Sequence, residues 1–129
     1  MNTMDDKSLF EKIGGMYAVD AAVEIFYNKV LADDRISHFF RWTHMKTQHA
    51  KQKAFLAYAF GAPLKYSGKS MSDAHKNLLE IGLNELHFDV VKEHLLSTLR
   101  DMEVAEELIL RVSDIAESTR DYILGNHVY

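Results

Sequence analysis

Residues 45–60 read MKTQHAKQKAFLAYAF, and this stretch carries the pattern that decides the fold. At about 100° per residue of an α-helix, Gln48, Gln52, Phe55 and Ala59 fall within one narrow stripe. Two glutamines therefore lie where a core-facing helix normally has apolar residues, and burying an amide without a partner costs free energy. The stripe predicts either a neighbouring helix or solvated groove, or a pocket that holds a polar ligand.

Helical spacing continues on both sides of this stretch. SLFE at residues 8–11 is a capping box, which predicts a short first helix ending at Gly14 and Gly15. Apolar residues recur at intervals of three and four between residues 19 and 31, up to a turn at Asp33 and Asp34. We expect a short helical piece over residues 72–80, followed by a long helix that Asn84 caps. One last helix is expected to have an apolar side formed by Leu108, Val112, Ile115, Thr119, Tyr122 and Ile123. Nothing predicts a strand, so the fold class is all-α.

Length and composition point to one globular domain. The 129 residues fit a single domain over 1–129, and we expect residues 1–7 to be a flexible extension and 125–129 a tail. No apolar stretch approaches the roughly 18 residues of a membrane helix, and the acidic start is unlike a secretory signal. The chain has no cysteine, which excludes disulfide scaffolds, thiol catalysis and iron–sulfur ligation. We therefore expect a cytoplasmic monomer that does not associate with membranes.

Charge is distributed unevenly along the chain. Residues 1–40 carry 4 basic and 7 acidic side chains (net −3), residues 41–83 carry 7 and 2 (net +5), and residues 84–129 carry 4 and 10 (net −6). The basic middle predicts either a solvated charged face or a site for a small anionic ligand. Nucleic acid is not expected as a partner, because the whole protein is acidic.

Two further residue types bear on a ligand site. Tyr27 lies on the apolar face of its helix, so it is either a core tyrosine bonded to a backbone carbonyl or, with the two glutamines, part of a hydrogen-bonding cage. Seven histidines occur, and no pair has the spacing of a helical zinc motif. His75 lies one turn before Leu78 and Leu79, where a lone histidine is usually structural.

Four stretches in order resemble the group I truncated haemoglobins of the cyanobacterial and algal type. They are FEKIGG (10–15), FYNKVLADD (26–34) followed by Phe39 and Phe40, QHAKQKAFL (48–56) with YAFG (58–61), and Tyr66, Gly68, Met71 and AHK (74–76). The resemblance covers nearly the whole chain and implies a two-over-two helical sandwich around one haem b.

The resemblance also implies roles for individual residues. His75 would be the proximal ligand of the haem iron, and Phe40 would pack on the haem face. Tyr27, Gln48 and Gln52 would form a distal cage that hydrogen-bonds dioxygen. The candidates to pair with the haem propionates are Arg41, Lys51, Lys53 and Lys69.

Two positions depart from the family pattern. Cyanobacterial relatives often have an iron-ligating histidine where this chain has Lys51, and an algal relative uses a lysine there. Lys51 is thus a candidate distal iron ligand, which would make the iron hexacoordinate, or a propionate partner; a ligating lysine must first lose its proton. Some relatives attach haem covalently through a histidine in the last helix. Ser118 stands at the position matched to it and His127 lies too late, so haem is expected to bind non-covalently.

The function that the resemblance implies is the binding of dioxygen, nitric oxide and carbon monoxide at haem iron. The role of this binding would be nitric oxide dioxygenation or redox protection. Dioxygenation needs an electron donor, which the sequence does not identify. The alternative is a cofactor-free helical interaction module, in which Tyr27, Gln48 and Gln52 meet a protein partner.

Overall fold

The computed structural model describes residues 8–40, 45–62, 75–76 and 78–125, and of residues 45–49 and 51 it describes the backbone alone. The elements in chain order are α1 (Leu9–Ile13), α2 (Gly15–Leu31), the 3₁₀ helix η2 (Ser37–Phe39), α3 (Met45–Ala59), α5 (Glu85–Asp101), α6 (Glu106–Glu117) and α7 (Arg120–Ile123). Residues 75–76 and 78–80 are also helical. The described part of the chain contains no strand, so the all-α prediction is confirmed.

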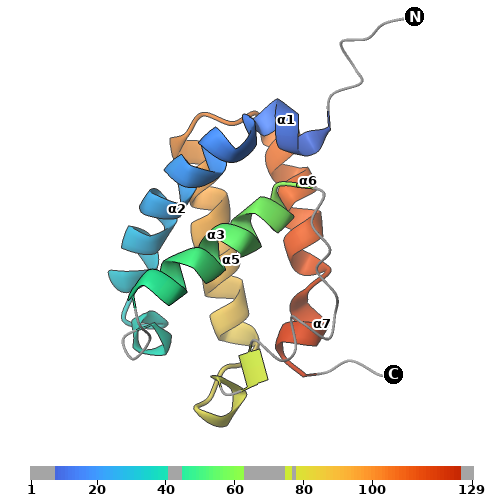
Figure 1. The fold of residues 1–129 in the computed structure, drawn as a ribbon. Helices are drawn as coiled ribbons and strands as arrows, with labels where there is room; N and C mark the ends of the chain where they lie inside the picture. The colour runs from blue at the N-terminus through green and yellow to red at the C-terminus, as the bar shows by residue number, and fades with distance from the viewer. Residues whose placement is uncertain (1–7, 41–44, 63–74, 77, 126–129) are drawn as a thin grey trace, which may run out of the picture.

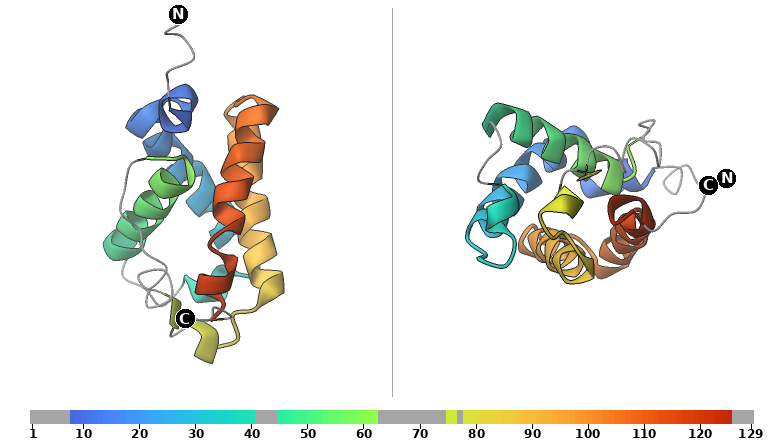
Figure 2. Two further views of the ribbon diagram at one scale, coloured as in Figure 1. Left: turned by 90° about the vertical axis from the view of Figure 1, so that its right-hand side faces the viewer. Right: turned by 90° about the horizontal axis from the view of Figure 1, so that it is seen from below.

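Two layers of paired helices form the molecule (Figure 1). Helix α2 packs against α3 in one layer, and α5 packs against α6 in the other. Across the interface α2 meets α5 and α3 meets α6, and Figure 2 shows the two layers edge-on. This arrangement is the expected two-over-two helical sandwich.

The predicted helix boundaries are largely confirmed. The Ser8 side chain accepts a hydrogen bond from the Glu11 amide at the start of α1. Gly14 ends α1 with a φ of 127°, and a Cβ added there would lie 3.0 Å from the Cβ of Ala18. A side chain at this position would therefore be both strained and crowded, which explains a glycine at the hinge.

The main core lies between the layers and includes the buried Val23 of α2, Leu56 of α3, Leu99 of α5 and Val112 of α6. The apolar face of α2 is buried as predicted, except at half-buried Tyr27 and exposed Leu31. A second core, as we call it, consists of the buried Phe88, Ile123 and Leu124 with the half-buried Phe55, Tyr58, Leu79 and Leu83. Complete burial of one such aliphatic or aromatic side chain contributes about 1.5–3 kcal/mol. The second core joins the short segment after residue 75 to α3, α5 and α7.

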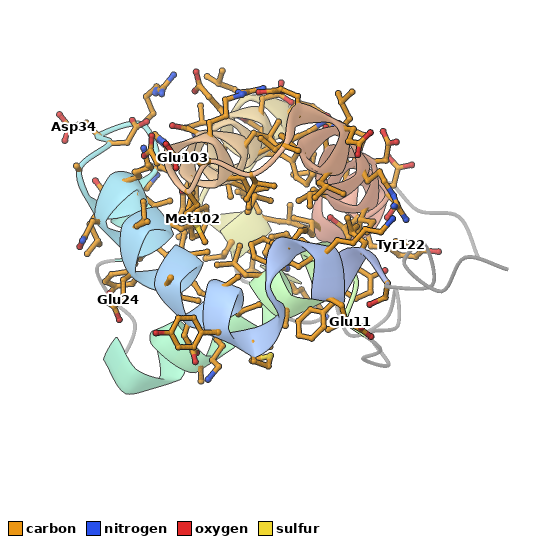
Figure 3. All side chains as sticks on the ribbon, turned by 90° about the horizontal axis from the view of Figure 1, so that it is seen from above. Glu11, Glu24, Asp34, Met102, Glu103 and Tyr122 are labelled. Atoms are coloured by element: carbon orange, nitrogen blue, oxygen red, sulfur yellow. The ribbon has the colours of Figure 1, made fainter. Side chains whose placement is uncertain are left out.

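The prediction of a single last helix is wrong, because the chain turns between α6 and α7. The Thr119 hydroxyl donates to the carbonyl of Ala116 at 2.6 Å, and the Ser118 hydroxyl donates to that of Ile115 at 2.5 Å. Such local bonds compete with helix continuation. The turn also leaves Tyr122 38% exposed at the edge of the molecule, not on the apolar side (Figure 3).

None of the described helices is long and apolar enough to span a membrane. The expected extension at residues 1–7, the end of the tail at 126–129 and most of the loop at 61–70 lie outside the described residues.

Candidate functional site

Gln52 is the most informative residue of the site. It lies on α3 and is 5% exposed, and neither its Nε2 nor its Oε1 has a hydrogen-bond partner in the described part of the chain. Leu56 and Ala59 of the same helix are fully buried, so the second half of α3 turns this side toward the interior. An amide left without a partner in such a place costs about 1–3 kcal/mol, and a ligand that supplies the missing bonds would offset this cost.

Tyr27 comes to this site from α2, which packs directly against α3. The tyrosine is half-buried and takes part in an interaction with other residues. The structure thus brings together the two helices that carry the predicted cage. The third predicted member, Gln48, lies in the first half of α3, and its side chain is outside the described residues.

Phe40 directly follows η2 and is half-buried. Its ring packs against the main core, while Phe39 beside it is 6% exposed. The turn that presents these rings is fixed by Asp33, whose carbonyl accepts from the amides of Ile36 and Ser37 at 3.1 and 2.8 Å. The position of Phe40 at the end of this turn is compatible with its predicted role on a haem face.

His75 is half-buried and lies in the helical residues 75–76, and residues 78–80 are helical as well. Leu78 packs against the main core and Leu79 against the second core. Residues three and four apart on a helix share a face, so His75 lies on the side of its segment that packs into the molecule. Among the described residues, no three side chains of the metal-ligating types cluster into a site for a free metal ion.

Of the four basic candidates for the propionates, the structure describes the side chain of Lys53 alone. Its Nζ lies 2.8 Å from Oδ1 of Asp20 on α2, a partner that the sequence could not indicate. Lys53 also follows Gln52 directly, so its side chain leaves α3 about 100° away from the buried amide. Lys51 is in α3, with its side chain outside the described residues, and Arg41 and Lys69 lie outside them altogether.

Sequence reasoning missed a charged cluster around Arg120, beside the second core. This guanidinium contacts carboxylates from two helices and lies over the ring of Phe88. The hydrogen bonds from Arg120 and Lys92 hold the pKa of Glu117 down at about 2. No spacing signal could have found the cluster, because Glu85 and Asp89 precede Arg120 by 35 and 31 residues.

The residues present fit haem. An unpartnered amide from α3 and a tyrosine from the neighbouring helix suit a small polar ligand in an apolar setting. A histidine on an inward-facing helical segment can supply an axial nitrogen. The fit rests on this donor set and on the buried amide in particular.

The comparisons with known proteins agree with this fit. The chain matches the bacterial-like globin family over residues 8–124. A group 1 truncated hemoglobin of Synechocystis sp. is 56% identical over 110 residues, which are 84% of this chain and 89% of that protein. The crystal structure of the 2/2 hemoglobin from Synechococcus sp. PCC 7002, in the cyanomet state and with covalently attached heme, has a TM-score of 0.84 at 45% identity and covers 92% of this chain and 99% of that one.

A third relative is also similar in its solved structure. The Fe(III) form of the truncated hemoglobin from Tetrahymena pyriformis has a TM-score of 0.80 at 42% identity, over 92% of this chain and 98% of that one. This protein therefore belongs to the bacterial-like globins as a group 1 truncated haemoglobin, and it binds haem and, at the haem, gaseous ligands such as dioxygen.

Proposed function

We propose that Tyr27, Gln48 and Gln52 hold dioxygen on the distal side of the haem, opposite His75, and that Phe40 packs on the haem face. The observation that carries this proposal is the buried amide of Gln52 with both polar atoms unpartnered. The amide N–H group can donate to a ligand that gains partial negative charge, and such a donor slows release of the ligand. Family membership favours this reading over the cofactor-free helical module.

A relative supports the same three residues. Structures of the Tetrahymena pyriformis globin have been solved with single substitutions of one tyrosine to phenylalanine and of two glutamines to glutamate. The first of those glutamines follows the tyrosine by 21 residues, and the second follows the first by 4. Tyr27, Gln48 and Gln52 have the same separations here.

The activity we propose is nitric oxide dioxygenation, in which dioxygen and nitric oxide combine to give nitrate. When bound, haem would supply the iron that binds the gas, and each nitrate formed would cost that iron one electron. That electron must return from a donor, so the proposal includes an external reductant. Donors that slow the release of dioxygen favour this reaction over gas carriage, because dioxygen then stays in place until nitric oxide arrives.

Lys51 is proposed as the distal iron ligand in the absence of gas. It is one residue from Gln52 in α3, and a ligating amine must be neutral, which burial and iron favour. Lys69 and Arg41 are then left to the propionates, together with Lys53 if it exchanges Asp20 for a propionate.

The role of Gln52 is tested by the rate at which dioxygen leaves the ferrous protein. Gln52→Leu keeps most of the side-chain volume but removes the donor, and we expect release to accelerate about tenfold because a hydrogen bond to a polarised ligand is lost. Stopped-flow displacement of dioxygen by carbon monoxide measures the rate. Thr98→Val is the matched control, because it removes a polar atom from a fully buried site on α5. An unchanged rate for Gln52→Leu would take Gln52 out of the cage.

The role of Lys51 is tested by visible spectra without gas. Wild type should give a six-coordinate low-spin ferrous spectrum with two sharp bands, and Lys51→Ala should give a five-coordinate high-spin one. Lys29→Ala is the control, because it removes an amine that pairs with Asp101 and has no proposed contact with haem. If Lys51→Ala leaves the ferrous and ferric spectra unchanged, Lys51 does not ligate the iron.

A further inference from the structure

Arg120, the first residue of α7, binds carboxylates from two other parts of the molecule. Its Nη1 donates to Oε1 of Glu85 at 2.8 Å and its Nη2 to Asp89, both on α5. Its Nε and Nη2 also donate to the two carboxylate oxygens of Glu117 at the end of α6. Lys92 joins at 2.8 Å from Glu117. Exposed single pairs contribute little, but a fork-shaped guanidinium in a network of this kind fixes geometry.

The guanidinium also covers part of the second core. Its Cζ lies 4.3 Å from the centroid of the Phe88 ring, and Phe88 is 7% exposed. Arg120 is itself only 21% exposed in its side chain, so the cation and the ring are partly shielded from water. The charged network and the apolar cluster thus meet at one residue.

The second core reaches the segment that carries His75. Leu79 is one of its members and lies four residues, or about one helical turn, after His75. The chain just beyond α7 sits against this leucine, because a Cβ built on Gly125 would lie 3.1 Å from Cδ1 of Leu79. Both views in Figure 2 place α7 beside the helical segment at residues 78–80.

Hydrogen bonds join residues 78 and 79 to the turn that leads into α5. The Leu78 carbonyl accepts from the amides of Ile81 and Leu83 at 3.2 and 3.0 Å, and the Leu79 carbonyl accepts from that of Gly82 at 3.2 Å. Asn84 then caps α5. A shift of α7 relative to α5 would therefore displace Leu79, and a displacement of Leu79 would change the position of His75.

Helix α7 cannot hold this position alone. It has four residues, far below the length at which a helix is stable by itself. Two hydrogen bonds from Arg120 tie α7 to α5, one to Glu85 and one to Asp89. We propose that Arg120 is a positioning residue for the proximal ligand: by clamping α7 onto α5 it fixes the second core under Leu79 and so the approach of His75 to the haem iron. This inference rests on the proposed proximal role of His75.

The test compares Arg120→Gln with Arg100→Gln in the holoprotein. Arg100 also joins two helices, through Glu106 at 2.9 Å, but it does not touch the second core. Two quantities are measured: the rate of haem transfer to excess apomyoglobin, and the hyperfine-shifted NMR resonances of the proximal histidine in the cyanide-bound ferric protein. Cyanide occupies the distal position, so these resonances report the proximal side.

We expect Arg120→Gln to speed haem loss at least about threefold and to shift the histidine resonances, with Arg100→Gln close to wild type in both. Arg120→Lys should be intermediate, because a lysine keeps the charge but cannot fork to three carboxylates. Should Arg120→Gln fail to fold, Glu85→Gln removes one contact of the clamp and should shift the same resonances in the same direction.

A purely structural Arg120 would lower the thermal midpoint and leave the resonances in place, and that result would overturn the inference. Equal effects of Arg120→Gln and Arg100→Gln would overturn it too. The variant His75→Ala distinguishes a failure of this inference from a failure of the proposed function. If His75→Ala keeps the proximal resonances, His75 is not the ligand and both ideas are wrong; if it loses them while Arg120→Gln is unchanged, the inference alone is wrong.

Discussion

Glu103 adopts a backbone conformation that side chains disfavour. It lies between α5 and α6 and has a φ of 61° (Figure 3). The chain reverses direction there, and the amides of Glu103 and Val104 donate hydrogen bonds to the carbonyls of Arg100 and Leu99, both at 3.0 Å. A residue with a Cβ pays about 1–2 kcal/mol in this region, whereas glycine is free to enter it.

Glu103→Gly should therefore raise the free energy of unfolding by about 0.5 kcal/mol, the relief of strain less the greater entropy of glycine in the unfolded chain. Urea unfolding of the ferric protein measures the change. Glu107→Gly is the control, because it removes the same charge inside α6 and should lower stability by about 0.5–1 kcal/mol. If both substitutions destabilise, no strain is relieved at position 103.

Single residues differ in how far the sequence reveals them. Gln52 was predictable as a misplaced polar residue, because helical geometry alone puts it on the apolar stripe. His75 was not, since a histidine next to two leucines is usually structural, and its proposed role came from family resemblance. The pairing of Lys53 with Asp20 depends on how α2 and α3 pack, which no local pattern encodes.

At the scale of elements, the start of α5 combines a predicted cap with an unpredicted one. The Asn84 side chain accepts from the amides of Leu86 and His87 at 3.0 and 3.3 Å. In return the Asn84 amide donates to Nδ1 of His87 at 3.1 Å, which completes a capping box with histidine where glutamate or glutamine is usual. The Phe39 ring meets the imidazole edge-on, with centroids 4.8 Å apart.

This cap should make stability depend on pH. Burial, and then repulsion from His38, lowers the pKa of His87 below its ordinary value of 6.5. The unfolded chain thus binds more protons than the folded one in this range, so the contribution is present above about pH 6.5 and is lost as the pH falls through the lowered pKa. His87→Gln keeps an acceptor for the Asn84 amide without a titrating group.

We expect the thermal midpoint of wild type to fall more than that of His87→Gln between about pH 7 and about pH 5. His38→Gln should reduce the extra fall without abolishing it, because burial is the larger cause of the shift. Parallel curves for wild type and His87→Gln would show that the cap does not titrate in this window.

Element boundaries were predictable where a local signal sets them, as at Ser8, Gly14 and Asn84. The boundary between α6 and α7 was not, because serine and threonine inside an apolar repeat are compatible with a continuous helix. The hydroxyls of Ser118 and Thr119 bond to carbonyls three residues back, and the turn is then held by Arg120. Local hydroxyl bonds and long-range contacts of Arg120 are thus both found where α6 gives way to α7.

On the scale of the whole molecule, the two layers enclose a polar side chain for which no described residue is a hydrogen-bond partner. The described chain leaves the Gln52 amide without a partner in an otherwise apolar interior. An unpartnered amide makes the fold alone less stable than an apolar residue would, and in the proposed role of Gln52 a bound ligand would offset that cost. At position 52, the proposed ligand binding favours an amide, whereas the stability of the protein without ligand favours an apolar side chain.

This opposition predicts that Gln52→Leu stabilises the protein without haem. Removal of an unsatisfied buried amide should raise the free energy of unfolding of the apoprotein by about 1–2 kcal/mol, measured by urea denaturation followed by circular dichroism. Thr98→Val, where the lost hydroxyl has a partner in the His94 carbonyl at 2.7 Å, should instead destabilise. In the dioxygen-bound holoprotein the gain of Gln52→Leu should shrink, since the wild-type amide is then bonded. Equal gains with and without haem and dioxygen would mean that the amide never meets the ligand.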